Sequence, residues 1–322
     1  MSAVTSLFGT SLFGTSLSRH RVKACLALVI TAATLVLAGC SNTLPGTAAS
    51  VGGNRITVDS LQSQVDAVLA YRDGQQGSTV RTQLPTITQQ VLSGDVLHEL
   101  VGMAVARTHL AVNEKAIDDQ LAKLDPKVLD GQGLTFITPA SLPQFVRDQL
   151  VIAQLGTAAW DGLAITADLA AAADQADAEA KARRMAQGPQ QSQAVVAEAT
   201  AKGQQARANY PLSPSALETL AGTPLFATPV GSAVAFTLND KWQVARIDTR
   251  TTTAAPTRTP DAVSAAQAKP SSTYSLGISL LPDLAGNPEV RVNPRYGNWD
   301  PTQGQVVSAS APPNAIVFNA RP

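Results

Sequence analysis

Apolar residues recur at helical spacing between residues 59 and 110. A pattern that begins at Asp59 keeps its apolar residues on one face and predicts an amphipathic helix. This helix is expected to end in the glycine-containing stretch 73–78. A longer pattern from Pro85 to Leu110 is apolar on more than one stripe, so we expect this helix in the middle of a helical assembly. The face of the first helix consists of Leu61, Val65, Val68 and Leu69.

Two further helices are predicted before residue 160. Asn113 is a suitable N-cap for a third helix, because its side chain can accept a hydrogen bond from a backbone N–H of the first turn. Ser141 and Gln144 form a capping-box pattern that opens a fourth helix. Helix following helix, with no alternating strands, indicates a mainly helical domain.

The second half of the chain changes its pattern. Residues 158–208 are rich in Ala, Gln and alternating charges, and they predict solvated helix with a break at Gly188-Pro189. Apolar residues alternate on both sides of Asn239-Asp240-Lys241, which predicts a β-hairpin between Val234 and Ile247. The remaining predictions are a linker or long loop over 249–272 and short strands at 290–292 and 306–307.

Composition narrows the function classes. The 322 residues are 44% hydrophobic, with 24 basic against 24 acidic side chains, which excludes intrinsic disorder throughout the chain. The charge balance is near neutral and the sequence has no long Lys/Arg run, so nucleic acid is not an expected partner, because phosphate binding needs a basic patch. The chain has no G-x-x-x-x-G-K-[ST] phosphate loop, and we therefore expect no nucleotide and no nucleotide-driven cycle.

The first 39 residues have the layout of a secretory signal peptide. Arg19, Arg21 and Lys23 stand before an apolar run from Ala24 to Leu37. The run ends in Leu37-Ala38-Gly39-Cys40, which resembles the lipobox of bacterial lipoproteins. The resemblance implies that Cys40 receives lipid and becomes the first residue of a mature chain on the extracytoplasmic face of the cell membrane.

A single-pass membrane anchor is the alternative, but the apolar run is shorter than the roughly 20 residues of a spanning helix. Residues 1–39 hold three basic and no acidic residues, so the mature chain has a formal net charge of −3. Cys25 leaves with the signal peptide and Cys40 carries lipid, so no thiol is left for a disulfide. Residues 41–50 are expected to form a polar tether, with order beginning near Val51.

Four stretches of the chain occur in an order that resembles a known class of proteins. Residues 51–57 (VGGNRIT) and the helix after them are followed by 109–117 (HLAVNEKAI), then by 229–233 (PVGSA) with the predicted hairpin, and last by 292–300 (VNPRYGNWD). The first two pieces resemble the N-terminal domain of the SurA and PrsA class of extracytoplasmic chaperones. The hairpin region resembles the last strands of a parvulin-type prolyl isomerase domain, and the closing piece resembles the C-terminal strand of actinobacterial members.

The resemblance implies an α+β fold: a mainly helical SurA-N-like chaperone domain, completed by a C-terminal strand, with a small degenerate parvulin-like α/β segment inserted. It also implies an ATP-independent holdase that binds unfolded or nascent exported polypeptides in broad apolar grooves rimmed by Gln, Ser and Thr. The predicted parts are the signal peptide 1–39, the lipidated tether 40–50, the helical domain 51–160, the parvulin-like segment 161–250, the linker 251–272, the segment 273–308 that returns to the helical domain, and the tail 309–322.

Catalytic chemistry is not expected. Active parvulins resemble one another in an Arg-His-Ile-like opening strand and in pocket His, Cys or Asp residues, whereas residues 165–250 contain neither His nor Cys. An active prolyl isomerase remains one alternative function. A solute-binding lipoprotein of a transporter remains another, and that class predicts two α/β lobes.

No metal or cofactor site is predicted either. His98 and His109 are eleven residues apart on one helix, about three turns, so they are expected to be separate surface residues. Asp118 and Asp119 are adjacent on a predicted helix, so their side chains point in different directions and are not placed to act together as a general acid and a general base. Without a partner His, a serine nucleophile lacks its base.

The closing aromatic residues are expected to be structural. Arg295, Tyr296 and Trp299 are predicted to pack a tight corner, formed with Pro294 and Gly297, that closes the domain. A peptide-stacking site is the alternative for the two aromatic rings. Trp160 is expected to fill a domain junction. The sequence does not identify the residues that bind a client polypeptide.

Overall fold

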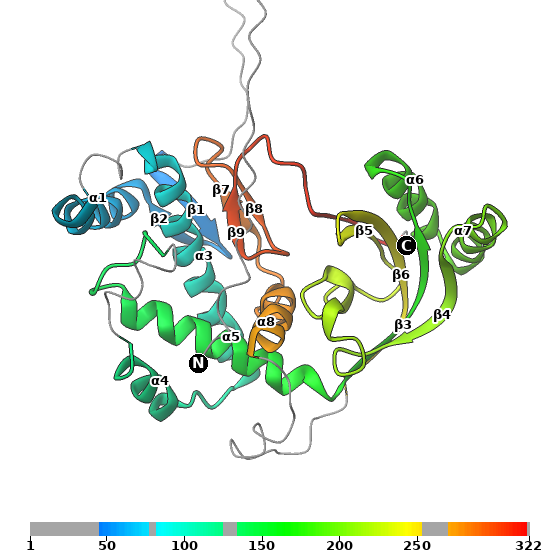
Figure 1. The fold of residues 1–322 in the computed structure, drawn as a ribbon, viewed down its shortest axis with the longest axis horizontal. Helices are drawn as coiled ribbons and strands as arrows, with labels where there is room; N and C mark the ends of the chain where they lie inside the picture. Colours follow the sequence, from blue (N-terminus) through cyan, green and yellow to red (C-terminus); the bar gives the residue numbers. More distant parts are fainter. Residues whose placement is uncertain (1–44, 77–81, 125–133, 253–269, 321–322) are drawn as a thin grey trace, which may run out of the picture. The chain divides into compact units, whose positions relative to one another are not determined.

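The computed structural model describes residues 45–76, 82–124, 134–252 and 270–320, which all belong to one compact unit, Pro45–Pro322 (Figure 1). The predicted signal peptide, the lipobox and Cys40 lie outside the described residues. The helices are α1 (Val58–Gln76), α3 (Leu84–Thr108), α4 (Glu114–Leu121), α5 (Leu142–Trp160), α6 (Gln175–Met185), α7 (Pro189–Ala201) and α8 (Pro270–Leu284). The short helices are η2 (Glu218–Leu220) and η3 (Pro224–Phe226).

The strands pair only in antiparallel fashion among the described residues. The fold is therefore α+β, as the sequence predicted, and these residues do not form the two α/β lobes of the solute-binding alternative. The strands are β1 (Thr47–Val51), β2 (Asn54–Thr57), β3 (Leu163–Ala171), β4 (Ala206–Leu212), β5 (Ala233–Leu238), β6 (Lys241–Thr252), β7 (Val290–Val292), β8 (Asn298–Asp300), β9 (Gln305–Val307) and β10 (Ala315–Phe318).

Helix α3 lies at the centre of the first hydrophobic core. It contacts α1, α5, α8, β1 and β9, which confirms the prediction from its broad apolar surface. Its fully buried residues include Ile87, Leu92, Val96 and Leu100. Helix α1 adds Leu61, Val65 and Val68 to the same core, the face that its sequence pattern predicts.

One of the two predicted helix caps is present. The Asn113 side chain accepts a hydrogen bond from the backbone N–H of Ala116 at 3.0 Å at the start of α4. The prediction of a capping box at Ser141 and Gln144 is wrong, because Ser141 has helical φ and ψ angles and its side chain makes no capping hydrogen bond to α5. Ser141 Oγ instead accepts from the backbone N–H of Thr138 at 2.9 Å.

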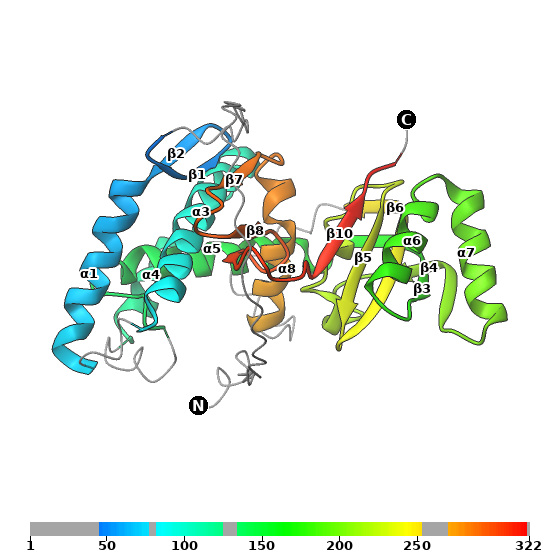
Figure 2. The same ribbon diagram turned by 90° about the horizontal axis from the view of Figure 1, so that it is seen from above.

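The chain closes on itself in a three-stranded sheet of order β2-β1-β7 (Figure 2). Ala49 lies opposite Val292, and the Asn293 N–H donates to the carbonyl of Ala48 at 2.8 Å, so the C-terminal segment lies beside the start of the described chain. The predicted tether is wrong for residues 47–50, which form β1. Thr47, Ala48 and Ala49 are buried, and such small side chains pack into a core without giving an apolar pattern.

A five-stranded sheet has the order β10-β5-β6-β3-β4. The β5–β6 hairpin and its turn at Asn239 and Asp240, both with positive φ, confirm the predicted hairpin. The solvated-helix prediction for 158–208 is wrong for residues 163–171, which form β3, and for residues 206–208, which belong to β4. The tail prediction is wrong for 315–318, because β10 pairs with β5.

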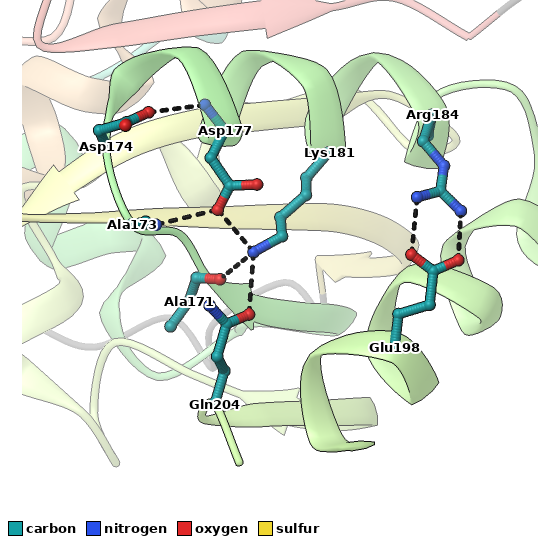
Figure 3. Close-up of polar contacts among 8 residues, drawn as sticks. All are labelled: Ala171, Ala173, Asp174, Asp177, Lys181, Arg184, Glu198 and Gln204. Atoms are coloured by element: carbon teal, nitrogen blue, oxygen red, sulfur yellow. Dashed lines mark hydrogen bonds and ion pairs between the residues drawn. The ribbon is translucent and has the colours of Figure 1, made fainter. Parts of the chain in front are cut away.

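Polar contacts join α6 to α7 and to the end of β3 (Figure 3). Helices α6 and α7 are the two helices predicted on either side of Gly188-Pro189. Asp174 caps α6 by accepting from the N–H of Asp177 at 2.9 Å. Lys181 Nζ reaches both Asp177 and the carbonyl of Ala171, each at 2.8 Å, and so ties α6 to the end of β3. Arg184 and Glu198 form a bidentate pair between the two helices at 2.8 and 2.6 Å.

The predicted linker is wrong at both of its ends, because β6 extends to Thr252 and α8 begins at Pro270. Ile278 and Leu281 of α8 belong to the first core, whereas Leu276 and Leu280 belong to a second core on the five-stranded sheet. Trp160, at the end of α5, is buried in the second core.

Helices α5 and α8 meet at their backbones. A Cβ on Gly156 would lie 1.8 Å from the carbonyl oxygen of Thr273, and a Cβ on Gly277 would lie 2.0 Å from that of Ile152. Only glycine fits at either position without moving one helix away from the other.

Alanine at either glycine should therefore destabilise the protein. We expect Gly156→Ala and Gly277→Ala each to lower the free energy of unfolding by about 1–3 kcal/mol, the usual effect of overpacking a close contact. Gly102→Ala on α3 is the matched control, because no atom lies within 4 Å of the added methyl group. It should raise the free energy by about 0.4–1 kcal/mol. Urea unfolding of a 41–322 fragment measures all three, and an unchanged midpoint for Gly156→Ala would contradict the close contact.

Candidate functional site

An apolar groove of about 180 Å³ lies between α4 and α5. The groove-lining residues of α5 recur at intervals of three and four, so they form one face of its first two and a half turns. Two glutamines, Gln120 of α4 and Gln149 of α5, are the polar members of the lining. The full lining is Gln120, Leu124, Leu134, Leu142, Phe145, Val146, Gln149 and Leu150.

A buried arginine fixes one wall of this groove. Arg72 of α1 donates to the backbone carbonyls of Leu134, Thr135 and Ile137 at 3.2, 3.1 and 3.0 Å. Burial lowers the pKa of Arg72 from its usual value. The segment that it holds presents Phe136 edge-on to Phe145, with ring centroids 6.0 Å apart.

Arg72 was missed by the sequence analysis although a signal existed. Residue 72 follows Val68 by four positions and Val65 by seven, so the helical period places it on the buried face of α1. A charged residue on that face needs a partner. The carbonyls of residues 134–137 come from a part of the chain that no local pattern connects to α1.

A polar cluster lies next to the groove on α3 and α5. Gln149 Nε2 donates to Tyr274 Oη at 3.0 Å, and burial raises the pKa of Tyr274. His98 Nδ1 lies 3.0 Å from the carboxylate of Asp148, which is 7% exposed. The hydrogen bond to Asp148 raises the pKa of His98 above 6.5. This ion pair therefore contributes stability below about pH 6.5, and the contribution is lost as pH rises through the folded-state pKa.

Asp95 is the most perturbed carboxyl group of the cluster. Burial raises its pKa from 3.8 to about 6, even though Gln64 Nε2 donates to it at 2.9 Å. His98 acts in the opposite direction to burial, and Glu99 adds to it. Asp95 therefore keeps its proton up to about pH 6 in the folded chain and carries a poorly solvated charge above that pH.

The predicted corner residues come together, but away from the groove. The backbone carbonyl of Tyr296 accepts from Gln89 at 2.8 Å, and Tyr296 and Trp299 pack, partly buried, against the first core. The Arg295 guanidinium lies 4.8 Å from the centroid of the Tyr296 ring. Gly297 has φ +129°, and a Cβ there would lie 2.0 Å from the carbonyl oxygen of Val307. Pro294 is exposed in the turn between β7 and β8.

The other candidate side chains do not converge. His109 ends α3 in a left-handed conformation and is exposed, while His98 pairs with Asp148. Asp119 pairs with Lys115 at 2.6 Å on the surface of α4. No group of three metal-ligating side chains that could hold an ion occurs within the described ranges. In the same ranges no helix is long and apolar enough to cross a membrane.

The five-stranded sheet carries buried charges that the sequence analysis did not single out. Asp168 of β3 accepts from the N–H of Asn209 at 2.9 Å, and Arg246 of β6 pairs with Asp248. Burial, with the nearby charge of Asp168, raises the pKa of Asp248. Arg250 pairs with Asp283 of α8 at 3.3 Å. Carboxylates paired with arginines are structural ion pairs and do not form a nucleophile with its base.

Comparison with known proteins bears on the N-terminal part of the chain. Residues 16–132 match the family model described as SurA-like N-terminal domain. This part of the chain is similar to a SurA-like N-terminal domain, which confirms the resemblance predicted there. Among the described helices the match spans α1, α3 and α4.

One of the similar solved structures is the crystal structure of the foldase protein PrsA from Lactococcus lactis. It is 14% identical, with a TM-score of 0.27, and the similarity covers 77% of this chain and 94% of that chain. None of the curated proteins matches this chain.

The raised pKa of Asp95 predicts a pH-dependent penalty on folding. An acid whose pKa is higher in the folded state makes the protein less stable as pH rises from about 3.8 to about 6, and the loss persists above that range. Asp95→Asn keeps an acceptor for Gln64 and removes the charge, so it should raise the free energy of unfolding at pH 7.5 by up to about 3 kcal/mol. The gain should shrink toward zero near pH 4.

Denaturant unfolding at both pH values measures this difference. Asp66→Asn on the exposed side of α1 is the control and should change stability by no more than about 0.5 kcal/mol. A gain that is the same at pH 7.5 and at pH 4 would show that Asp95 does not titrate as described.

Proposed function

We propose that this protein is an ATP-independent holdase that binds apolar segments of unfolded polypeptides. The SurA-like N-terminal domain supports a chaperone role. The observation that carries the proposal is the groove between α4 and α5, whose lining consists of six apolar side chains and two glutamines. This composition is the Gln-rimmed apolar surface expected of a binder without sequence preference.

The size of the groove sets what it can hold. An apolar cavity of about 150 Å³ accommodates one benzene molecule, so the 180 Å³ groove suits one aromatic or large aliphatic side chain. The two glutamines can hydrogen-bond the peptide groups on either side of that side chain. A protein with these properties selects for exposed apolar residues, which unfolded chains display and folded chains bury.

The expected affinity is low. Burying one large apolar side chain contributes about 1.5–3 kcal/mol, roughly a ten- to hundredfold gain in binding. Weak binding suits a holdase, because a client that is released unchanged needs no energy input to leave. Preferential binding to the unfolded state shifts the client equilibrium by mass action alone.

We further propose that the chaperone acts outside the cytoplasm and is held to the membrane by lipid on Cys40. The charge-then-apolar order of residues 19–37 and the Leu37-Ala38-Gly39-Cys40 motif support this location. The clients would then be unfolded or nascent exported proteins. Two or more acyl chains give durable anchoring, since each buried methylene contributes about 0.8 kcal/mol.

Strands β3 to β6 of the five-stranded sheet begin within the predicted parvulin-like segment 161–250, and we infer that this sheet does not catalyse prolyl isomerisation. Between Leu163 and Thr252 the chain has no His and no Cys. The buried charges of β3 and β6 are engaged with one another or with backbone, as Asp168 with Asn209 and Arg246 with Asp248. A binding or spacing role for this segment fits the side chains better than proton transfer does.

Suppression of client aggregation tests the proposal. The 41–322 fragment contains the whole compact unit Pro45–Pro322 and should suppress light scattering by denatured citrate synthase at a few-fold molar excess. Leu124→Ser and Phe145→Ser should each raise the concentration needed by about tenfold, because each removes apolar surface from the groove.

Val230→Ser is the matched control, since this side chain is 52% exposed and lies outside the groove lining. It should behave like the parent fragment. Circular dichroism and unfolding midpoints establish that the groove variants are folded at the assay temperature. Lack of suppression by the parent fragment at several-fold excess would refute the holdase role.

Lipid attachment is tested in the full chain. Labelling of cells with an alkyne analogue of palmitate should mark the protein. Cys40→Ser should abolish the label, and no mature lipoprotein should then be found in the membrane fraction. Cys25→Ser, inside the apolar run, is the control and should keep the label. Label that persists in Cys40→Ser would rule out this residue as the attachment site.

A further inference from the structure

The outer edge of β5 is covered by the chain's own C-terminal strand. Strand β10 pairs antiparallel with β5, with Ala315 opposite Phe236 and Phe318 opposite Ala233. In the order β10-β5-β6-β3-β4, β10 is the end strand (Figure 2). Four residues thus cover an edge whose first four residues, Ala233, Val234, Ala235 and Phe236, are at most 2% exposed.

Few interactions hold β10 in place. Residues 308–313, which lead into it, are exposed, and Val317 within it is 46% exposed. Its main contacts are with β5 and with α6, where the Arg183 guanidinium lies 5.2 Å from the centroid of the Phe318 ring. Before the strand, Asn314 Nδ2 donates to Asp300 at 3.0 Å. A four-residue strand at a sheet edge with few buried contacts belongs to the less stable parts of a fold.

Release of β10 would expose the edge of β5, which is suited to pairing with another strand. Once unpaired, β5 presents a row of free N–H and C=O groups, which is a template for strand addition. The side chains on both sides of this row are apolar. Ala315 packs into the second core, whereas Phe318 packs with Ala233 and Ala235 in a separate core beneath α6 and α7.

The occupant now in place shows the chemistry that fits. Residues 301–320 contain no charged side chain, and the paired part is Ala-Ile-Val-Phe, a sequence of high β-propensity. Its side chains alternate between the two faces of the sheet. An uncharged, extended segment of this kind is also what an unfolded client offers.

We propose that the edge of β5 is a second binding site, which takes an uncharged extended segment of an unfolded polypeptide in place of β10. The bound segment becomes an added strand of the sheet, with affinity from main-chain hydrogen bonds and selectivity from the apolar positions on either side. This inference rests on the proposed holdase function, and it assigns the five-stranded sheet a role that the α4–α5 groove does not fill.

Tethering makes β10 a competitor of the client. A segment on a short linker has an effective concentration in the millimolar range. A free strand with the same contacts therefore binds the intact chain poorly and binds well once β10 is removed. The C-terminal strand restricts the site to clients that are present in excess or that bind at additional points.

A labelled peptide tests the site directly. The probe is a fluorescent peptide with the sequence of residues 312–320, PPNAIVFNA. Fragment 41–311, which lacks β10, should bind it at least tenfold more tightly than fragment 41–322. A control peptide with Phe318→Asp should not bind either fragment, because it would place a charge against Ala233 and Ala235.

A disulfide lock tests the exchange without deleting the strand. The Thr237 N–H donates to the carbonyl of Asn314, which lies opposite it, so Thr237 and Asn314 form a hydrogen-bonded pair. Hydrogen-bonded and non-hydrogen-bonded pairs alternate along an antiparallel ladder. Val234 is three residues from Thr237, so Val234 and Val317 form a non-hydrogen-bonded pair, in which the side chains are close. The fragment 41–322 contains no native cysteine, so Val234→Cys with Val317→Cys can form only this disulfide. The oxidised variant should lose peptide binding and part of the aggregation suppression, and a reductant should restore both.

The outcomes separate this inference from the holdase role. Peptide binding that is equal in fragments 41–311 and 41–322, or unaffected by the oxidised lock, would overturn the second site and leave the groove untouched. Should fragment 41–311 fail to fold, the lock alone decides. A peptide-free dimer on gel filtration that the lock abolishes would assign the edge to a second copy and also overturn the proposal. Leu124→Ser should impair aggregation suppression while leaving peptide binding to fragment 41–311 unchanged.

Discussion

The backbone contact between α5 and α8 is the interaction on which the rest of the structure depends. Gly156 and Gly277 let two helices from distant parts of the sequence approach at van der Waals distance from each other's carbonyl groups. Each helix also supplies side chains to both cores, Leu155 and Trp160 from α5 and Ile278 and Leu276 from α8. Because interiors are closely packed, a shift of either helix would disturb both cores at once.

This contact also positions the candidate binding surface. The C-terminal half of α5 is engaged with α8, and its N-terminal half presents Leu142, Phe145 and Leu150 to the groove. A helix anchored along one half holds the other half in place, where Phe145 and Leu150 stay partly exposed. Arg72 completes the arrangement, because its bonds to the carbonyls of residues 134–137 fix the opposite wall at the cost of burying a charge.

The sequence predicted those elements whose apolar residues follow a clear period. Helices α1 and α3 and the β5–β6 hairpin have such a period, and their buried faces match it. Strands β1 and β3 are built largely from Ala and Thr, which pack without an apolar signal, and α8 contains Ser, Thr, Gly277 and Pro282, so it resembles a loop. The groove could be predicted in kind, apolar with a Gln rim, but its place depends on the tertiary contacts of Arg72, which no local pattern encodes.

The two proposed surfaces differ in what they recognise, and the difference explains how a chaperone can bind many sequences. In the proposed function the groove takes one large apolar side chain and is indifferent to its neighbours, while the proposed site at the edge of β5 takes a main chain and excludes charge. Either alone gives weak binding. An unfolded client is a flexible chain, so engagement at one surface raises the effective concentration of the rest of the client at the other. A folded protein offers neither an exposed apolar side chain nor a free strand, and therefore gains nothing from the pair.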